Sequence, residues 1–588
     1  MDIGVPSIRN LFRIKRERRW LWIAIGLTSI PLHLIYNSAV YNSLAANDIL
    51  VTTVTNNHFE HGAYSNMTEA LAGYYSASPR TREKMRNGYP DIQLFRGVLD
   101  GYDTSTNTYE DLTPSECTKL YNTDFLTNRR NLFLITKHNS TTFRNNTLLD
   151  IFNVRSEGLS PNSWMCASHL EGITGVYRRY SFKCSPEELT SNVTSGLPWL
   201  VKLGKGDDVE ISGCKSERTT EKCKVQFSLG IMVVVICCNL VKACCMVMAV
   251  VRSREPTLVT LGDAVDSFLE IPDPTTIGIC FADRQFIERV WRRGWRTGPR
   301  QWKQKGVQRW WTSVSKTRWI TCNFFCLITI ITAGMLLWLG MGNDGSYWSI
   351  DIKSMWARGL GKVNSVSIVA ITPKNITEAI LLANLPQTIL SFLYLTYNSF
   401  FTCMLSGHEW SLFSHHHRTL RVTSPRPGQR STYWLQIPYT YAIPLMTLSG
   451  LLHWLTSQSL FLARLDISDP LGKKTTRTVN AVGYSSIAIL FVLTLGVLAL
   501  LTAAGMGYKP FAAGTTTVSS CSAAISAACH ARGEDSEEIR GKKVRWGDVG
   551  LVPNLGVRHL TFSSEEGVRK PVFGEVYAGV GREGVDLS

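Results

Sequence analysis

The chain has 588 residues and a formal net charge of +16. Its apolar residues are gathered in blocks between long polar stretches and its mean hydropathy is near zero, which excludes both an ordinary soluble enzyme and a bare helix bundle in a membrane. Residues 41–224 carry 20 Lys and Arg against 21 Asp and Glu, so the basic excess surrounds the apolar blocks. Beside such blocks, basic residues indicate cytoplasmic flanks rather than a nucleic-acid site.

Six stretches are long and apolar enough to cross a hydrocarbon core, which takes about 20 residues in a helix. In chain order they are Trp20–Val40, Phe227–Val251, Ile320–Met341, Ala379–Leu405, Tyr439–Leu462 and Ala481–Met506. The first could be a signal peptide, but its apolar run exceeds the usual length of one, so we favour a retained anchor. The sequence therefore predicts an all-α membrane protein with about six transmembrane helices.

Basic residues orient these spans, because loops rich in Lys and Arg remain in the cytoplasm. Six basic residues precede the first span, and 13 lie within residues 252–318. The predicted cytoplasmic segments are 1–19, 252–319, 406–438 and 507–588, and the predicted outside segments are 41–226, 342–378 and 463–480. The last of these is a mild exception to the charge rule, because it carries four basic residues.

Glycosylation sequons and cysteines favour the same orientation. The predicted glycosylation sites are Asn66, Asn139, Asn145, Asn192 and Asn375, all in segments that the charge rule assigns to the outside. The candidate disulfide cysteines are Cys117, Cys166, Cys184, Cys214 and Cys223, all in the large outside segment. Their odd number leaves one free or paired with another chain, and the sequence does not give the pairing.

The outside segment 41–226 is too long for a simple loop. Aromatic and turn residues recur in it and no long helical period appears, so we expect a mixed α/β domain with long loops, stabilised by disulfides. It could recognise an extracellular ligand, or it could be a structural ectodomain without one. The sequence identifies neither a ligand nor an oligomeric state.

Two features mark the predicted cytoplasmic segment 252–319. Residues 286–319 interleave Trp with Arg and Lys, so we expect them to lie on the anionic inner leaflet, with an ordinary basic loop as the alternative. Before them, a short helical pattern carries several carboxylates, which are Asp263, Asp266, Glu270 and Asp273. We interpret these as a solvated face rather than a cation site.

Polar residues interrupt several spans, and ionisable groups at membrane depth are costly and often functional. His33, Asn384, Gln387 and His453 form a candidate polar path near mid-membrane. The alternative, which we favour, is hydrogen bonding between packed helices. Lys242 also lies in a span, and we expect it to extend its ammonium group toward the cytoplasmic end.

The tail after Met506 is rich in Gly, Ser, Ala and charged residues. We expect it to be largely extended or disordered, apart from a buried or lipidated small-residue segment around Cys521 and Cys529. No nucleotide-binding, hydrolase or zinc-protease motif occurs in the chain. The sequence therefore predicts no cofactor and no metal, and it argues against an enzyme.

Seven stretches of the chain carry a family resemblance. They are DIGVPSIRNL (2–11), PLHLIYNSAV (31–40), KVQFSLGIMVVVICCNLVKA (224–243), VTLGDAVDSFLEIPDPTT (259–276), LLANLPQTILSFLYLTYNSFFTCML (381–405), STYWLQIPYTYAIPLMTLSGLLHWLTSQSLF (431–461) and SCSAAISAACH (520–530). Together they resemble a fungal family of multi-spanning membrane proteins defined only by a domain of unknown function. The resemblance implies the topology but no activity. It also implies further membrane-spanning sequence before DIGVPSIRNL, so this chain looks short at its N-terminus.

Three functions remain in order of preference. The first is a receptor-like or scaffold protein that acts through its outside domain. The second is a transporter or channel that uses the polar path, and the last is a membrane enzyme acting on lipids or glycans. The expected location is the plasma membrane or a secretory-pathway membrane, with membrane lipids as partners and no nucleic acid.

Overall fold

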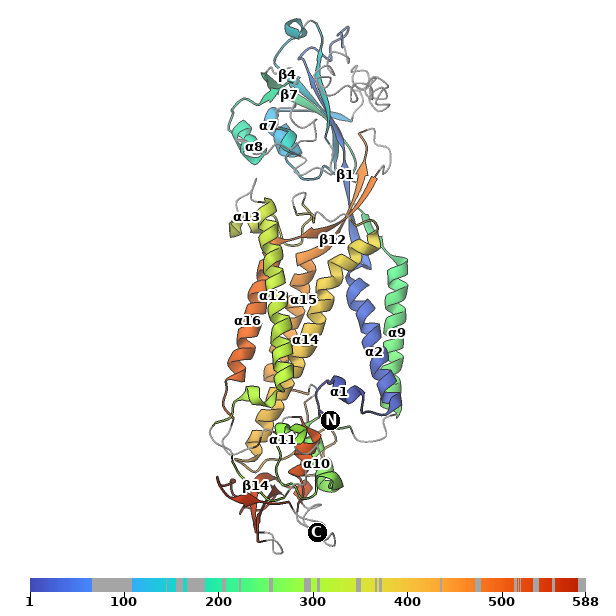
Figure 1. Cartoon of the computed structure of the whole chain (residues 1–588). Coiled ribbons are helices and arrows are strands. Elements are labelled where there is room, and N and C mark those ends of the chain that lie inside the picture. Colours follow the sequence, from blue (N-terminus) through green and yellow to red (C-terminus); the bar gives the residue numbers. More distant parts are fainter. Residues whose placement is uncertain are drawn as a thin grey trace.

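The computed structural model describes residues 1–65, 108–143, 145–154, 162–165, 186–203, 208–221, 224–252, 257–289, 298–303, 307–344, 351–364, 367–369, 373–433, 436–470, 477–511, 516, 518, 520–531, 539–551 and 556–579. They form an elongated molecule of four stacked parts (Figure 1). From top to bottom of the figure we name these parts the head domain, the neck sheet, the helix bundle and the base domain.

The helix bundle consists of α2 (Arg16–Ile35), α9 (Leu229–Arg252), α12 (Lys316–Asp344), α14 (Ile376–Phe413), α15 (Tyr439–Ser459) and α16 (Ser486–Gly507). Five of these, all except α15, are long and apolar enough to cross a membrane. Many of their apolar side chains are exposed, which suits lipid rather than water as the solvent. The chain is therefore a membrane protein with five candidate membrane-spanning helices, and the fifth predicted span forms a helix of 21 residues beside them.

The bundle divides into a pair of helices and a group of four. α2 packs along α9, whereas α12, α14, α15 and α16 pack among themselves, and contacts between α2 and α14 join the two sets. Figure 1 shows the α2–α9 pair leaning away from the group toward the base. Within the group, the ring of Trp319 lies so close to Gly507 that a Cβ there would stand 3.0 Å from it. Small residues thus allow these helices to approach closely.

The neck sheet stands on top of the bundle. Its strand order is β13–β12–β1–β8, formed by β1 (Val40–Asn47), β8 (Lys224–Phe227), β12 (Leu460–Ser468) and β13 (Arg477–Tyr484). β1 pairs in parallel with β12 and antiparallel with β8, and β12 and β13 pair antiparallel. The predicted outside loop 463–480 therefore contains most of a β-strand, β12, and the start of its partner.

The head domain is a six-stranded sheet with two helices against it. Its strands are β2 (Ile49–Val54), β3 (Tyr109–Leu112), β4 (Arg129–Thr136), β5 (Leu148–Val154), β6 (Leu200–Lys202) and β7 (Asp208–Arg218), in the order β3–β7–β4–β2–β5 with β6 on β7, and its helices are α7 (Pro114–Tyr121) and α8 (Pro186–Thr194). Trp199, Tyr121 and Leu132 are buried between sheet and helices. The expectation of mixed α and β structure is confirmed.

The base domain is built around the last turn of α14, where Trp410 and Phe413 enter a large apolar core. Around them lie α10 (Leu261–Glu270), α11 (Arg284–Arg289), α17 (Ser522–Ala527) and a sheet of order β14–β15–β16–β9, with β9 (Arg300–Gln301), β14 (Arg545–Leu551), β15 (Arg558–Ser563) and β16 (Val576–Tyr577). The expectation of a largely extended or disordered tail is therefore wrong, because the tail supplies most of this sheet.

The tryptophan-rich segment is not a single surface strip. Trp302 and Trp310 are each only 3% exposed and belong to two protein cores, whereas Trp311 is 41% exposed. Trp291 and Trp295 lie outside the described residues. The expectation that the segment lies as a whole on the inner leaflet therefore fails for its buried indoles, whose apolar area is already covered by the chain itself.

Candidate functional site

Each strand of the neck sheet continues a helix of the bundle. β12 follows α15 directly, and a single residue separates β13 from α16 and β8 from α9. β1 follows α2 through the short 3₁₀ turn Tyr36–Ser38 and Ala39. Neighbouring junctions are hydrogen-bonded, since the Ser228 amide donates to the Ala39 carbonyl (3.0 Å) and the Ser485 amide donates to the Ser459 carbonyl (3.0 Å). Four helices thus enter one hydrogen-bonded sheet with no flexible loop between.

The neck sheet is fixed to the head domain by two links. At the first, Asn47 ends β1, and its side-chain amide donates to the Arg129 carbonyl of the head at 2.9 Å. At the second, the Asn131 side-chain amide on β4 donates to the Pro470 carbonyl, beyond the end of β12, at 2.9 Å. Phe125 of the head also packs against an apolar cluster of the neck. The head is therefore joined to both β1 and β12.

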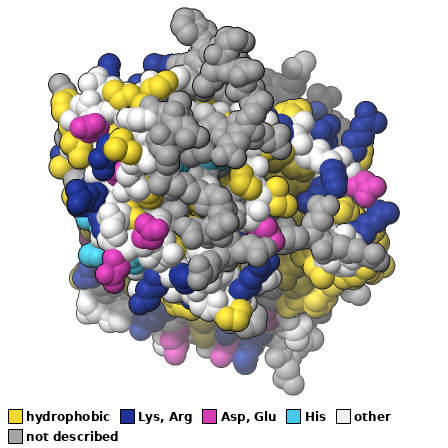
Figure 2. Space-filling view, turned by 90° about the horizontal axis from the view of Figure 1, so that it is seen from below, with side chains coloured by type: hydrophobic (Ala, Val, Ile, Leu, Met, Phe, Trp, Pro, Cys, Tyr) yellow, Lys and Arg dark blue, Asp and Glu magenta, His cyan; other side chains and the backbone are white. Residues whose placement is uncertain are grey.

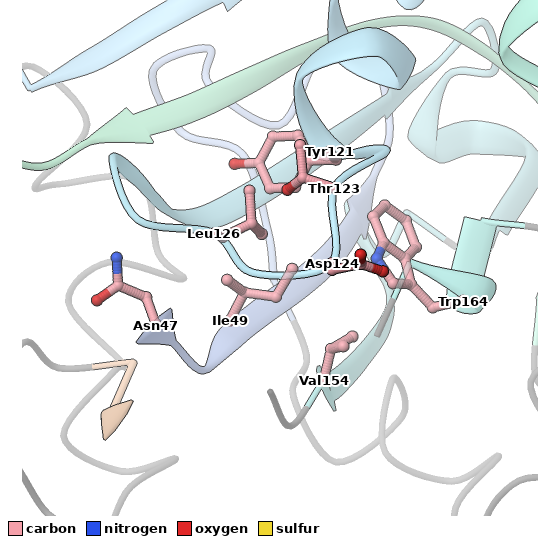
Figure 3. A pocket seen from close by; sticks show the side chains of 8 residues that line it. All are labelled: Asn47, Ile49, Tyr121, Thr123, Asp124, Leu126, Val154 and Trp164. Atoms are coloured by element: carbon pink, nitrogen blue, oxygen red, sulfur yellow. The ribbon is translucent and has the colours of Figure 1, made fainter. Parts of the chain in front are cut away.

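A small hollow with room for about one water molecule lies in the head beside the first link (Figure 3). It is lined by Asn47, Ile49, Tyr121, Thr123, Asp124, Leu126, Val154 and Trp164. Tyr121 and Trp164 are almost completely buried, so their rings pack the wall rather than offer an open face. Because Asn47 belongs both to this wall and to the link, repacking of the hollow would disturb the junction with the neck.

Beneath the neck, the four residues of the candidate polar path converge from three helices. Asn384 on α14 donates to the Ser38 hydroxyl at 2.8 Å, and Gln387 accepts from the Asn37 amide at 2.5 Å. His33 on α2 lies 3.2 Å from the Ser391 hydroxyl. Its ring also stacks on that of His453, with 6.1 Å between centroids. We call this set, with Asn37, Ser38 and Ser391, the polar cluster.

The polar cluster lies toward the neck end of the bundle. His33 is two residues before the end of α2, and His453 is six residues before the end of α15. Asn384 and Gln387 are buried, whereas His33 and Asn37 are exposed on the α2 side. These contacts between helices fit the packing interpretation, and His33 and Asn37 lie at the surface of the bundle.

The cysteines divide between one bridge and several free thiols. Cys117 on α7 and Cys214 on β7 form a disulfide across 97 residues of sequence. The other three candidates, Cys166, Cys184 and Cys223, lie outside the described residues.

The sequons lie at the upper end of the molecule. Asn139, Asn145 and Asn192 are exposed on the head domain, and Asn375 is exposed at the start of α14, beside the neck. Asn66 lies outside the described residues. All four described sequon asparagines are therefore on the same side of the bundle as the disulfide.

The carboxylates of α10 are structural rather than solvated. Asp263 forms a capping box with Thr260 and accepts from the Thr423 amide at 2.7 Å, which joins α10 to the loop after β10 (Arg421–Val422). Asp273 caps a short 3₁₀ turn through the Thr275 amide. The expectation of a solvated face is wrong here, and no group of three metal-ligating side chains occurs within the described ranges.

Two further carboxylates of α10 share one buried arginine. Asp266 and Glu270 bind Arg540 at 2.9 and 2.8 Å, and the Arg540 side chain is only 4% exposed. Burial alone would raise the pKa of Asp266, but the hydrogen bonds and charge of Arg540 outweigh it and lower that pKa. Arg540 thus ties the tail to the helix that follows α9.

The N-terminal segment closes the base domain against the bundle. Asp2 pairs with Cys521 in a β-bridge, and its buried carboxylate lies 3.2 Å from Arg284 on α11 and 3.6 Å from Arg318 on α12. Gly4 has φ +67°, and a Cβ there would stand 2.4 Å from the Val259 carbonyl, so only glycine fits. The quoted stretch DIGVPSIRNL therefore joins three distant parts of the chain.

The neck sheet and the base domain were not predicted from the sequence. A signal for the neck was present, because Ala463, Leu465 and Ile467 alternate with less buried residues in the two-residue period of a strand. For the base, the large apolar residues Trp546, Leu560 and Phe562 in the tail indicate a folded core rather than disorder.

Comparison with known families places two segments of the chain. Residues 292–580 match the model described as a domain of unknown function, DUF8419, and residues 1–43 match that of a family of unknown function, DUF6536. The first covers the helices from α12 to α16 together with the tail of the base, and the second covers the N-terminal segment, α2 and the start of β1. The resemblance to a family defined by a domain of unknown function is confirmed.

No curated protein and no solved structure matches the chain.

Proposed function

We propose that this membrane protein is receptor-like and passes the state of its head domain through the neck sheet and the helix bundle to its base domain. The observation that carries the proposal is the short connection between helix and strand at all four neck strands, where at most four residues lie between them. A flexible loop would absorb a displacement of the head, whereas a hydrogen-bonded sheet shifts as a unit. A partner bound to the head would act on the neck through Asn47, whose side chain joins β1 to the head.

The proposal assigns the head to the outside and the base to the cytoplasm. Exposed sequon asparagines and a disulfide on the head side support this orientation, because both modifications belong to the secretory lumen. On the base side, Lys and Arg side chains surround much of the visible face in Figure 2. Exposed examples are Arg426, Arg430, Lys542, Lys543, Arg569 and Lys570. Such a surface suits the anionic inner leaflet of a plasma or secretory-pathway membrane.

In the same proposal α15 is the sixth span. Pro444, His453 and Gln458 lower the hydropathy of this helix. It nevertheless packs against α14 and α16 and runs in the same direction across the bundle. It also leads directly into β12, as α2 leads into β1, so both helices must reach the neck. A cysteine introduced just before Tyr439 should react with a membrane-impermeant maleimide from the side opposite to that of a cysteine introduced after Ser468.

The coupling is testable with a nanobody selected to bind the head of the full-length chain in nanodiscs. We expect its binding to change hydrogen exchange in β14 and β15 of the base. A Gly-Gly-Ser insertion between Asn47 and Asp48 should abolish that change, whereas the same insertion after the exposed Gly196 should not. A panel of head-binding nanobodies that leaves exchange in the base unaltered would refute the proposal.

A second candidate function is transport through the polar cluster, which the convergence of His33, Asn384, Gln387 and His453 favours. Proteoliposomes loaded with dyes for protons or chloride measure it directly. Loss of flux in His453→Ala, with flux retained in the exposed base variant His416→Ala, would support transport. An enzyme acting on lipids or glycans stays the lowest-ranked candidate.

A further inference from the structure

The chain segments just before α12 and just after α16 lie side by side at the base end of the helix bundle. Two backbone hydrogen bonds of 2.9 and 2.7 Å join them, one on each side of an antiparallel β-bridge between Arg309 and Pro510. Side chains along such paired segments alternate between two faces. The ring of Trp310 is buried in the protein core, 4.8 Å from the ring of His408. Its neighbours Arg309 and Trp311 are exposed and lie on the opposite, outer face.

Tyr508, which is 67% exposed, completes this outer face. The guanidinium carbon of Arg309 lies 5.0 Å from the centroid of the Tyr508 ring, and Nη1 of Arg309 donates to the Tyr508 carbonyl at 3.1 Å. Trp311 lies beside Gly507, where an added Cβ would stand 3.4 Å from the Cβ of the tryptophan. We call Arg309, Trp311 and Tyr508 the stacked-arginine face.

Most hydrogen-bond donors of Arg309 remain available to a ligand. A guanidinium carries five N–H donors, and in the part of the chain that the structure describes the bond to a backbone carbonyl engages one of them. No described carboxylate pairs with Arg309. Neither residues 289–343 nor residues 470–533 contain an Asp or Glu. Glu409, at the base end of α14, is paired with Arg421 at 2.7 Å. The stacked-arginine face therefore favours an anionic ligand.

This face stands where two candidate membrane-spanning helices meet the base domain. α12 begins at Lys316 and α16 ends at Gly507. Ile320 is exposed in the first turns of α12. Leu501 is exposed about two turns before Tyr508 and therefore on the same side of α16. Trp and Tyr rings favour the head-group region of a bilayer. The face thus has aromatic rings at the level of the head groups and apolar side chains toward the interior of the bilayer.

We propose that the stacked-arginine face binds the phosphate of an anionic phospholipid. The remaining donors of the Arg309 guanidinium match two phosphate oxygens, as in bidentate arginine–phosphate pairs. The acyl chains lie along α12 and α16, over Ile320 and Leu501. Lys316 and Lys509 are exposed at the same end of these helices, so a head group of net negative charge is favoured over zwitterionic phosphatidylcholine. The site does not depend on the receptor-like function proposed above.

The test titrates the full-length chain, purified in detergent, with phosphatidylserine and with phosphatidylcholine, and native mass spectrometry counts the bound lipids. We expect the parent chain to bind phosphatidylserine more tightly. Arg309→Gln should weaken that binding about fivefold or more, the effect of one basic residue close to an anionic lipid surface. Arg430→Gln is the matched control, because it removes an exposed arginine of the base domain outside this face, and it should bind like the parent.

Trp311→Ala is a second variant, which leaves Arg309 and its bond to the Tyr508 carbonyl intact. It should also weaken phosphatidylserine binding, whereas Trp356→Ala, in α13 (Ile352–Ala357) at the neck end of the bundle (Figure 1), should not. Unchanged binding in both Arg309→Gln and Trp311→Ala would overturn the proposal, as would a parent chain that binds the two lipids equally. The nanobody experiment on the neck is unaffected by either result, so failure of one proposal is distinguishable from failure of the other.

Discussion

The head domain and the base domain stand at opposite ends of one bundle and are built on different plans. The head comes from the single stretch of chain between β1 and β8, and its core contains the Cys117–Cys214 disulfide. The base collects pieces from the N-terminal segment, the stretch after α9, the end of α14 and the tail. Two of its thiols, Cys280 and Cys529, are buried and free, and burial raises the pKa of Cys280 to about 12.

The two domains differ in how much conformational entropy the chain loses when it folds. A continuous stretch of chain has shorter loops to close than scattered segments have, and a cross-link restricts its unfolded state. The base has to bring together residues hundreds of positions apart, and it does so on helices that the membrane has already placed. Buried ion pairs such as Arg540 with Asp266 then fix the pieces in register. The comparison predicts that the two domains fail separately.

The largest expected effect lies in the base. Arg540→Ala leaves Asp266 and Glu270 without their shared cation, and breaking such a buried pair costs about 3–5 kcal/mol. Hydrogen exchange in β14 and β15 should accelerate while that in β2 and β4 stays unchanged. Arg426→Ala is the control, because its contact with Glu270 is exposed. Accelerated exchange in the head as well would show that the two domains do not unfold independently.

The disulfide gives the matching test of the head. Replacing both Cys117 and Cys214 with Ala should cost about 2–5 kcal/mol, because the unfolded head regains the freedom that the bridge removes. Thermal unfolding followed by hydrogen exchange should show β2 and β4 opening earlier and the base unaffected. The exposed thiols Cys237 and Cys244 on α9, replaced together, serve as the control. An unchanged head would mean that its apolar core suffices.

A smaller effect is expected at the cap of α10. Thr260 accepts from the Asp263 amide and donates to the Arg421 carbonyl at 2.7 Å, so it joins two of the four pieces. Thr260→Ala should destabilise the base by about 1–2 kcal/mol, the upper part of the usual range for a lost N-cap. Ser267→Ala, inside the same helix, should be neutral. Equal melting temperatures for both variants would show that the Thr260 cap does not stabilise the base.

The smallest effect is a dependence of the base on pH. Burial, together with the charge of His559, lowers the pKa of His530, whose ring contacts Thr276 at 2.8 Å. The unfolded state then takes up the proton first as the pH falls, so stability is complete above about 6.5 and declines below it. Thermal unfolding between pH 7.5 and 5.5 should show this decline, and His530→Gln should reduce it. A base that gains stability on acidification would reverse the sign and contradict the assignment.

Hydropathy located the helices because a bilayer span is a local pattern that needs no partner. It could not locate the neck, since the apolar strand residues Val40, Leu460 and Leu462 extend the same runs and read as further turns of helix. The base domain could not be predicted from the sequence for a different reason. In its core Trp546 packs against Trp302 and Trp410. The three residues come from separate stretches, and no local pattern in the sequence predicts that they meet.

The residues of the polar cluster were predictable from the sequence, but their contacts were not. The residue types and their spans followed from the cost of polar groups in lipid, and the structure brings all four together. Their meeting depends on the rotation of α2, α14 and α15 about their own axes, which packing decides.

The β-bridge between Asp2 and Cys521 can form only after Cys521 has been synthesised, late in translation. At a synthesis rate of about 5–20 residues per second, the first of these residues waits on the order of 25–100 s for the second to leave the ribosome. Throughout that interval the membrane already holds inserted helices, while the acidic side chain, Gly4 and Val5 have no strand to join. A ribosome that stalls in the final span would therefore leave a nascent chain with its head closed and its base open, a form that proteases on that face of the membrane can distinguish from the finished protein.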